Sequence, residues 1–247
     1  MGSGENAVSR GRPNAPACDL PGLTPELYAR WRASALGSLT EALERRLVLR
    51  HIGDVAGRDI LEIGCGDGDL AVRLAELGGR VSAIDASEQM IAAARQRASA
   101  HHANVNFRLG IAQQIPFEDG SFDIVVAVTI LCFVRDATPV FREIARVLKP
   151  GGRLVIGELG RWSTWAAERR IRAWLGSELW KRGFFRTPAD LRALARSVGL
   201  VPVAVEGAVY YPRWLWAARL LAPVDDHLRD ISTVGAAFLV LEASKPA

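Results

Sequence analysis

The stretch ILEIGCGDGDL, residues 60–70, places three glycines two positions apart directly after an apolar run. An apolar strand that enters a glycine-rich turn and then a helix is typical of the first unit of a doubly wound α/β sheet. Glycine has no side chain, so the backbone of such a turn can approach a ligand closely. The stretch therefore predicts both a fold class and the place of a ligand site.

Apolar runs alternate with amphipathic helical patterns along most of the chain. Continuous apolar strands separated by such helices predict a parallel sheet covered on both faces, which is the doubly wound α/β class. Two late runs, 200–208 and 236–244, have no clear helix between them and are expected to form an antiparallel C-terminal edge. The other expected strands are 59–65, 80–85, 105–110, 122–128 and 152–159, which makes seven in a mostly parallel sheet.

A chain of 247 residues is long enough for one well-cored domain. Residues 1–22 are rich in Gly, Pro, Asn and Ser and are predicted to be a disordered tail, which leaves a single domain over 23–247. Its first part, 23–52, is expected to be a helical arm. The pattern changes later in the chain, and the segments 160–186 and 210–233 are expected to be helical insertions that form a lid.

Composition narrows the possible classes of protein. The three cysteines, Cys18, Cys65 and Cys132, have unrelated spacings that predict no disulfide framework and no metal site, and they suit the reducing cytoplasm. No apolar run approaches the roughly 18 residues that a membrane span needs, and the N-terminus lacks the apolar core of a signal peptide. The net charge of +4 comes from arginines scattered among acids, so a nucleic-acid partner is not expected.

The acidic residues around the glycines indicate the kind of ligand. A dinucleotide-binding loop would carry its third glycine where Asp69 stands, and the Gly-Lys-Ser/Thr of a phosphate-binding loop is missing. Glu62 in the strand and Asp67 in the turn would repel a pyrophosphate and suit a ligand with cationic groups. Asp85, at the end of the second strand, is placed to accept hydrogen bonds from both hydroxyls of a ribose.

Four segments resemble, in order and spacing, the motifs of class I S-adenosylmethionine-dependent methyltransferases. The resemblance covers about 59–159 and is strongest to the ubiquinone and menaquinone biosynthesis methyltransferase group. It implies a Rossmann-like methyltransferase fold with S-adenosylmethionine as donor, S-adenosylhomocysteine as product, and methyl transfer by in-line displacement. The segments are LEIGCGDG at 61–68, IDAS at 84–87, IPFEDGSFDIVVAV at 115–128 and IARVLKPGGRLVIGEL at 144–159.

The resemblance also assigns expected roles to residues of this chain. Gly64 and Gly66 would lie against the methionine part of the donor, Glu62 would support the loop, and Asp85 would hold the ribose hydroxyls. Ala86 and others would line the adenine. The full expected donor site is Tyr28, Glu62, Gly64, Cys65, Gly66, Asp67, Gly68, Asp85, Ala86, Met90, Ala112, Gln113, Val128 and Thr129.

One position departs from the family pattern. After the third strand the family usually carries Gly-Asp-Ala, whose Asp accepts from the adenine amine, whereas this chain has Ile111 in that place. We expect weaker adenine binding or compensation by Gln113. The departure leaves open a protein that binds the donor without catalysis, and a nicotinamide-dependent oxidoreductase is the other alternative, which Asp69 disfavours.

The sequence identifies no catalytic residue. A sulfonium donor is already activated, so a general base is needed only for a weakly acidic oxygen or a protonated nitrogen. The fourth strand ends in VAVTILCFV, residues 126–134, and lacks the Asn/Asp-Pro-Pro-Phe/Tyr of relatives that methylate amines or nucleobases. This ending favours a small-molecule acceptor.

Six of the seven tryptophans follow Gly160, and with the N-terminal arm they predict an apolar lid over the acceptor. Such a lid favours a small, rather apolar acceptor with an oxygen, sulfur or carbon nucleophile. The arginine-bordered helix around Trp174 is expected to pack within the fold, with peripheral membrane contact as the alternative. The candidate acceptor residues are Trp31, Cys132, Trp162, Tyr210 and Tyr211.

Overall fold

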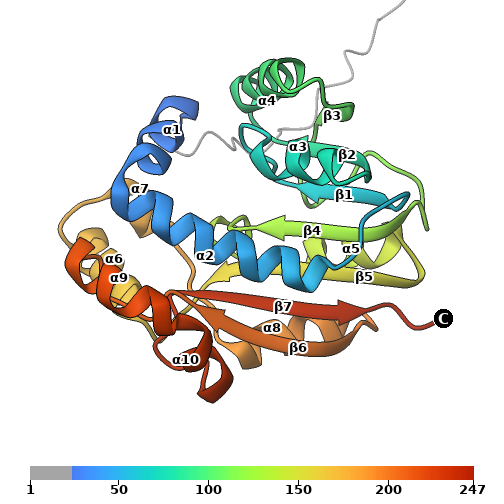
Figure 1. Cartoon of the computed structure of the whole chain (residues 1–247). Coiled ribbons are helices and arrows are strands. Elements are labelled where there is room, and N and C mark those ends of the chain that lie inside the picture. The colour runs from blue at the N-terminus through green and yellow to red at the C-terminus, as the bar shows by residue number, and fades with distance from the viewer. Residues whose placement is uncertain (1–23) are drawn as a thin grey trace, which may run out of the picture.

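The computed structural model describes residues 24–247, and the predicted tail over 1–22 lies outside the described residues. A seven-stranded sheet with the order β3-β2-β1-β4-β5-β7-β6 forms the centre of the molecule (Figure 1). The strands are β1 Asp59–Ile63, β2 Arg80–Asp85, β3 Val105–Leu109, β4 Phe122–Val128, β5 Leu148–Leu159, β6 Val201–Ala208 and β7 Phe238–Ser244. The predicted class, a mostly parallel doubly wound sheet, is confirmed.

The antiparallel pairing of the two C-terminal strands is also confirmed. β7 runs antiparallel to both β5 and β6 and lies between them, so the outermost strand on this side is β6. Burial explains the order, because β7 is buried on both faces over Phe238–Leu241, whereas β6 exposes Val201 and Val203. A strand that is apolar on both faces is stable only inside a sheet.

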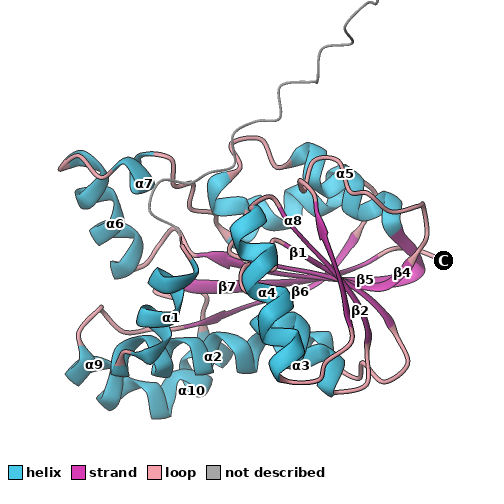
Figure 2. Cartoon of the chain, turned by 90° about the horizontal axis from the view of Figure 1, so that it is seen from above, coloured by secondary structure: helices cyan, strands magenta, loops and turns pink. Residues whose placement is uncertain are grey.

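Helices cover both faces of the sheet (Figure 2). Side chains of α2, α3 and α4 form one buried cluster with the sheet, and those of α5 and α8 form a second on the opposite face. The helices are α1 Pro25–Ala33, α2 Ala35–Ile52, α3 Asp69–Glu76, α4 Glu88–Ala100, α5 Thr138–Val147, α6 Thr164–Trp174, α7 Glu178–Lys181, α8 Pro188–Ser197, α9 Leu215–Leu221 and α10 Asp225–Ile231, with 3-10 turns η1 Leu131–Phe133 and η2 Ala222–Val224. Among these described helices, none has the length and apolar character needed to cross a membrane.

The N-terminal arm consists of two helices that meet at Ser34. Thr24 caps α1 by accepting a hydrogen bond from the Leu27 amide at 3.3 Å, and Ser34 caps α2 by accepting from the Gly37 amide at 3.0 Å. Because the N-cap residue has extended rather than helical backbone angles, the chain turns at Ser34. α1 therefore packs on α2 and contacts α4, which brings it over the carboxyl ends of the central strands.

The late helical segments are attached to α2 by buried polar and aromatic contacts. Trp165 of α6 is 3% exposed, and its indole N–H donates to the Tyr211 carbonyl at 2.6 Å. The Tyr211 hydroxyl is in turn hydrogen-bonded to Thr40 of α2 at 3.0 Å. Trp165 also meets Trp31 of α1 edge-on, with ring centroids 6.1 Å apart. α6 is thereby held beside the junction of α1 and α2.

Candidate functional site

Two adjoining cavities open at the carboxyl ends of β1, β2 and β4. The larger has a volume of about 350 Å³ and the smaller about 170 Å³. They share five lining residues, so they are two ends of one cleft. The shared residues are Tyr28, Gly64, Gly66, Val128 and Thr129.

The glycine turn gives each of its glycines a different environment. Gly66 has a φ of +53°, and no other group lies within 4 Å of the place where its side chain would be. Its backbone is therefore open to the cleft. Gly68 has a φ of +78°, and a side chain there would come within 2.8 Å of the Ala94 Cβ in α4. Gly68 lies outside both cavities and permits α3 and α4 to pack closely.

Asp85 joins the end of β2 to the glycine turn. Its carboxylate accepts hydrogen bonds from the backbone amides of Gly66 at 2.8 Å and Ser87 at 2.9 Å. A carboxylate has about four acceptor sites, so two such bonds leave capacity for the hydroxyls of a ligand. Asp85 lines the larger cavity together with the departing residue Ile111. Nine other members of the expected donor site also line it: Tyr28, Gly64, Gly66, Ala86, Met90, Ala112, Gln113, Val128 and Thr129.

Glu62 is a buried carboxyl group aimed at the cleft. It is 4% exposed, and among the described residues its Oε2 atom has no hydrogen-bond partner. Burial, followed by the nearby carboxylates of Asp69 and Asp85, raises the pKa of Glu62 well above its ordinary value. A cation in the cleft would favour the ionised form and lower this pKa. The site therefore fits a ligand with an ammonium or sulfonium group.

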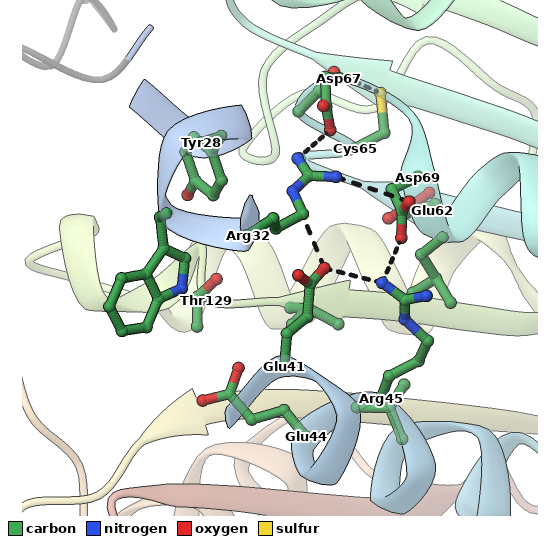
Figure 3. Close-up of a pocket in the computed structure, with 16 residues that line it drawn as sticks. Tyr28, Arg32, Glu41, Glu44, Arg45, Glu62, Cys65, Asp67, Asp69 and Thr129 are labelled. Carbon is green, nitrogen blue, oxygen red and sulfur yellow. Dashed lines mark hydrogen bonds and ion pairs between the residues drawn. The ribbon is translucent and has the colours of Figure 1, made fainter. Parts of the chain in front are cut away.

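Asp67 in the glycine turn and Asp69 at the start of α3 are ion-paired to arginines from other helices. Figure 3 shows the pairs that Arg32 and Arg45 form. Arg32 of α1 contacts Asp67 at 2.5 Å, and Arg97 of α4 contacts the other oxygen of Asp67 at 2.6 Å. Asp69 pairs with Arg45 of α2 at 2.8 Å. These ion pairs connect α1 and α2 to the turn and to the start of α3.

The smaller cavity has residues that the sequence analysis did not identify. Glu41, Glu44, Arg45 and Val48 all line it, at spacings of three, four and seven along one face of α2. Their spacing along one helix face could have identified these residues, but charged residues on a helix usually face solvent and were therefore not considered. Arg32, Asp69 and Leu70 complete the lining, and of the expected donor site Glu62, Cys65 and Asp67 also line this cavity.

The expected acceptor residues are not brought together. Trp31 lines the smaller cavity, whereas the other four lie in neither cavity. Cys132 is fully buried, and burial raises the pKa of its thiol well above the ordinary value. Tyr211 is bonded to Thr40, the Tyr210 hydroxyl donates to the Ser232 carbonyl at 2.6 Å, and Trp162 is 59% exposed.

Sequence comparison places the chain among methyltransferases. Residues 61–156 match a family described as a methyltransferase domain. Ubiquinone biosynthesis O-methyltransferase of Xanthomonas oryzae pv. oryzae (strain PXO99A) is 35% identical over 173 residues, which cover 68% of this chain and 72% of that protein. The protein of the same name from Bradyrhizobium diazoefficiens is 33% identical over 187 residues, 72% of each chain.

Solved structures share the fold. A Thermotoga maritima S-adenosylmethionine-dependent methyltransferase, described as a possible histamine N-methyltransferase, superposes with a TM-score of 0.68 at 24% identity, covering 89% of this chain and 95% of that one. Magnesium protoporphyrin IX methyltransferase from Synechocystis PCC 6803, solved with bound S-adenosylhomocysteine, gives a TM-score of 0.65 at 18% identity over 89% and 93%. The chain therefore belongs to the class I S-adenosylmethionine-dependent methyltransferases, in the group of the ubiquinone biosynthesis enzymes, and it transfers a methyl group from S-adenosylmethionine.

Proposed function

We propose that this methyltransferase methylates a hydroxyl oxygen of a small, rather apolar molecule. The observation that carries the proposal is the continuous cleft, because its larger end has groups suited to an adenosyl donor and its smaller end places Trp31, Val48 and Val128 beside charged residues. Oxygen is favoured over sulfur and carbon because the relatives at 33–35% identity are O-methyltransferases.

The donor would be held by residues at the ends of β1 and β2. Asp85 would accept from the ribose hydroxyls, the backbone at Gly64 and Gly66 would face the methionine part, and Glu62 would balance the positive charge. Bound there, S-adenosylmethionine supplies a methyl group that its sulfonium has already activated for displacement. The remaining task of the chain is to align the acceptor with that methyl group and to exclude water.

The acceptor would occupy the end of the smaller cavity that α1 and α2 close. Trp31, Val48 and Val128 give this end an apolar surface. Tyr28 stands between the two ends of the cleft, and burial raises its pKa to about 12, so its hydroxyl stays neutral. An apolar ring would pack against these three side chains.

A panel of small acceptors tests the proposal. Phenol, 4-propylphenol, thiophenol and aniline are each supplied with S-adenosylmethionine, and the release of S-adenosylhomocysteine is measured. We expect release with the phenols, and a higher kcat/KM for the propyl derivative. Release with aniline alone would contradict the proposal. Asp85→Ala is the control for the donor end, and we expect it to weaken S-adenosylhomocysteine binding about tenfold or more by calorimetry.

We also propose that the late helices touch an anionic bilayer surface, from which an apolar acceptor is taken up on the cytoplasmic side. Trp174 is 85% exposed, and Trp214 and Trp216 stack with ring centroids 5.8 Å apart while both remain exposed. Exposed tryptophans beside arginines are typical of helices that lie at a membrane interface. The exposed arginines on the same helices are Arg170, Arg172 and Arg219.

A further inference from the structure

Glu44 differs from three other carboxylates of the smaller cavity. Glu41, Asp67 and Asp69 each form an ion pair with an arginine. Glu44 has no ion pair and no hydrogen bond of its side chain to any residue within 24–247. In Figure 3 it lies on the Thr129 side of the cavity, apart from the paired groups. Its carboxylate is therefore free to bond a ligand.

The position of Glu44 is on the acceptor side of the cleft. It comes from α2, one turn after Glu41, and it lines the cavity with Trp31 and Val48. Glu62 also lines this cavity without an ion pair among the described residues, but it lies in β1 beside the glycine turn. Glu44 is thus the unpaired carboxyl group that α2 contributes to the smaller cavity.

Charged groups from neighbouring elements bear on Glu44. Burial raises the pKa of Glu44 to about 7, Arg169 of α6 opposes the rise, and Glu41 adds to it. Tyr211, from the segment after β6, also interacts with it. A carboxyl group that titrates near neutral pH is half-ionised under working conditions, which suits acceptance of a proton.

A second buried carboxyl group with a similar pKa is placed differently. Burial also raises the pKa of Glu158 to about 7. However, Glu158 is fully buried, lies outside both cavities, and accepts a hydrogen bond from the Leu131 amide at 2.6 Å. It holds the turn after β4 in place, so it has no route to an acceptor.

We propose that Glu44 is the general base of the reaction, and this proposal rests on the proposed oxygen acceptor. A carboxylate oxygen of Glu44 accepts the proton of the acceptor hydroxyl. The electron pair of the broken O–H bond forms the new O–C bond to the methyl group, while the pair of the broken S–C bond stays on sulfur. The proton then leaves Glu44 for solvent, which restores the carboxylate.

Glu44→Gln tests this role through its dependence on acceptor acidity. With 4-propylphenol near pH 7, we expect kcat to fall about 100-fold or more, because a general base contributes on that order. With 4-nitrophenol at about pH 9, where the acceptor is already ionised, we expect little loss. Equal losses with both phenols, or no loss with either, would overturn the proposal.

Two further variants control for altered packing. Glu41→Gln removes a neighbouring carboxylate from the same cavity, and we expect it to keep the acid limb of the pH profile of kcat that Glu44→Gln abolishes. Glu44→Asp keeps a carboxylate, and we expect it to restore that acid limb with a lower kcat. A limb that is lost in Glu41→Gln and kept in Glu44→Gln would assign the base to Glu41 instead.

A measurement without donor or acceptor checks the titration of Glu44 directly. A carboxyl group whose pKa rises on folding holds its proton longer in the folded state, so it lowers stability as pH rises from its ordinary value of 4.5 to about 7. We expect the Tm of Glu44→Gln to rise relative to that of the unchanged protein across this range and then to level off. A pH-independent difference would overturn the titration on which the proposal depends.

The outcomes separate this proposal from the one on which it rests. Failure to bind S-adenosylhomocysteine would overturn the proposed donor site. Binding with methylation of thiophenol or aniline but of no phenol would overturn the oxygen acceptor, and Glu44 as its base with it. Methylation of 4-propylphenol that Glu44→Gln leaves unchanged would overturn the role of Glu44 alone.

Discussion

Gly66 and Gly68 both have left-handed backbone angles, but only Gly66 faces open space. An alanine at either position is strained, because side chains rarely adopt a positive φ. At Gly68 the added methyl group would also collide with Ala94. The two glycines thus have separable roles, one in the ligand site and one in helix packing.

We predict that one alanine variant mainly loses stability and that the other mainly loses affinity for the ligand. Gly68→Ala should destabilise the protein by about 1–3 kcal/mol with little change in the affinity of the folded protein for S-adenosylhomocysteine. Gly66→Ala should weaken that binding about tenfold or more, because its methyl group enters the cleft. Urea unfolding and calorimetry measure the two effects. Equal losses of affinity in both variants would show that Gly68 also acts at the ligand.

The residues of the donor end could be foreseen because strand ends place them. Asp85 ends an apolar run, and all parallel strands deliver their last residues to the same edge of the sheet. Glu44 and Arg32 could not be foreseen in this way. Each is a charged residue on a helix, and only the turn at Ser34 and the packing of α2 on the sheet direct them into the cleft.

At the scale of elements, one arginine joins α1 to the glycine turn. Arg32 reaches Asp67 and lies 3.6 Å from Asp69, and its side chain is only 17% exposed. None of the residues of α1 is fully buried, although Trp31 packs against Trp165. The ion pairs of Arg32 therefore act together with this aromatic contact to keep the helix in place.

Arg32→Ala should loosen α1. We expect faster amide exchange over 25–33 and roughly tenfold weaker S-adenosylhomocysteine binding, since breaking a partly buried pair leaves a carboxylate without its partner. Arg30→Ala, on the same helix but exposed, is the matched control and should change neither. Unchanged exchange in Arg32→Ala would mean that other contacts hold the helix.

Ion pairs also join the amino ends of the central strands. Asp59 of β1 accepts from Arg80 of β2 and from Lys149 of β5, both at 2.7 Å. These bonds hold the pKa of Asp59 well below its ordinary value of 3.8. A carboxyl group with a lowered pKa stabilises the fold above its ordinary pKa, and this stabilisation is lost as pH falls further.

Asp59→Asn should therefore lower the Tm at neutral pH, by an amount that shrinks as the pH falls below 3.8. Thermal unfolding of both proteins from about pH 2 to about pH 7 measures this difference in Tm. Asp54→Asn is the control, because Asp54 accepts only from the Ala56 amide at 3.1 Å among the described contacts. A constant difference at all pH values for Asp59→Asn would contradict the ion-pair explanation.

Most helices and strands could be predicted from the apolar runs, but two boundaries differ from the prediction. The arm was expected as one helix, but a serine N-cap divides it, and a cap is hard to recognise inside a helical pattern. β5 begins at Leu148 instead of 152, because Leu148 pairs with Phe122 across an irregularity in the strand.

For the molecule as a whole, the cleft opens at the carboxyl ends of the central strands, and the late helices expose several tryptophans. A helical pattern over α6 was visible in the sequence, whereas α9 lies between two late strands where no clear helix was expected. Whether the apolar side chains of such helices face the core or solvent depends on tertiary packing. Trp165 is buried, whereas Trp174 on the same helix is 85% exposed. Tryptophans of one helix thus lie both in the core and on the surface.

The exposed tryptophans should carry binding to anionic bilayers. Replacement of both Trp214 and Trp216 by alanine should reduce cosedimentation with vesicles of phosphatidylglycerol and phosphatidylcholine about fivefold or more. A double alanine variant of Val201 and Val203, which are also exposed but lie on β6, is the matched control and should bind as before. Equal binding by all three proteins would argue against this surface.

The central claim is that the methyl group goes to oxygen. The protein is incubated with S-adenosylmethionine that carries a ¹³C-labelled methyl group and with 4-propylphenol, and the product is examined by ¹³C NMR. The account predicts a labelled aryl methyl ether, and none with Asp85→Ala. A label on a ring carbon, or no labelled product from a protein that binds S-adenosylhomocysteine, would contradict it.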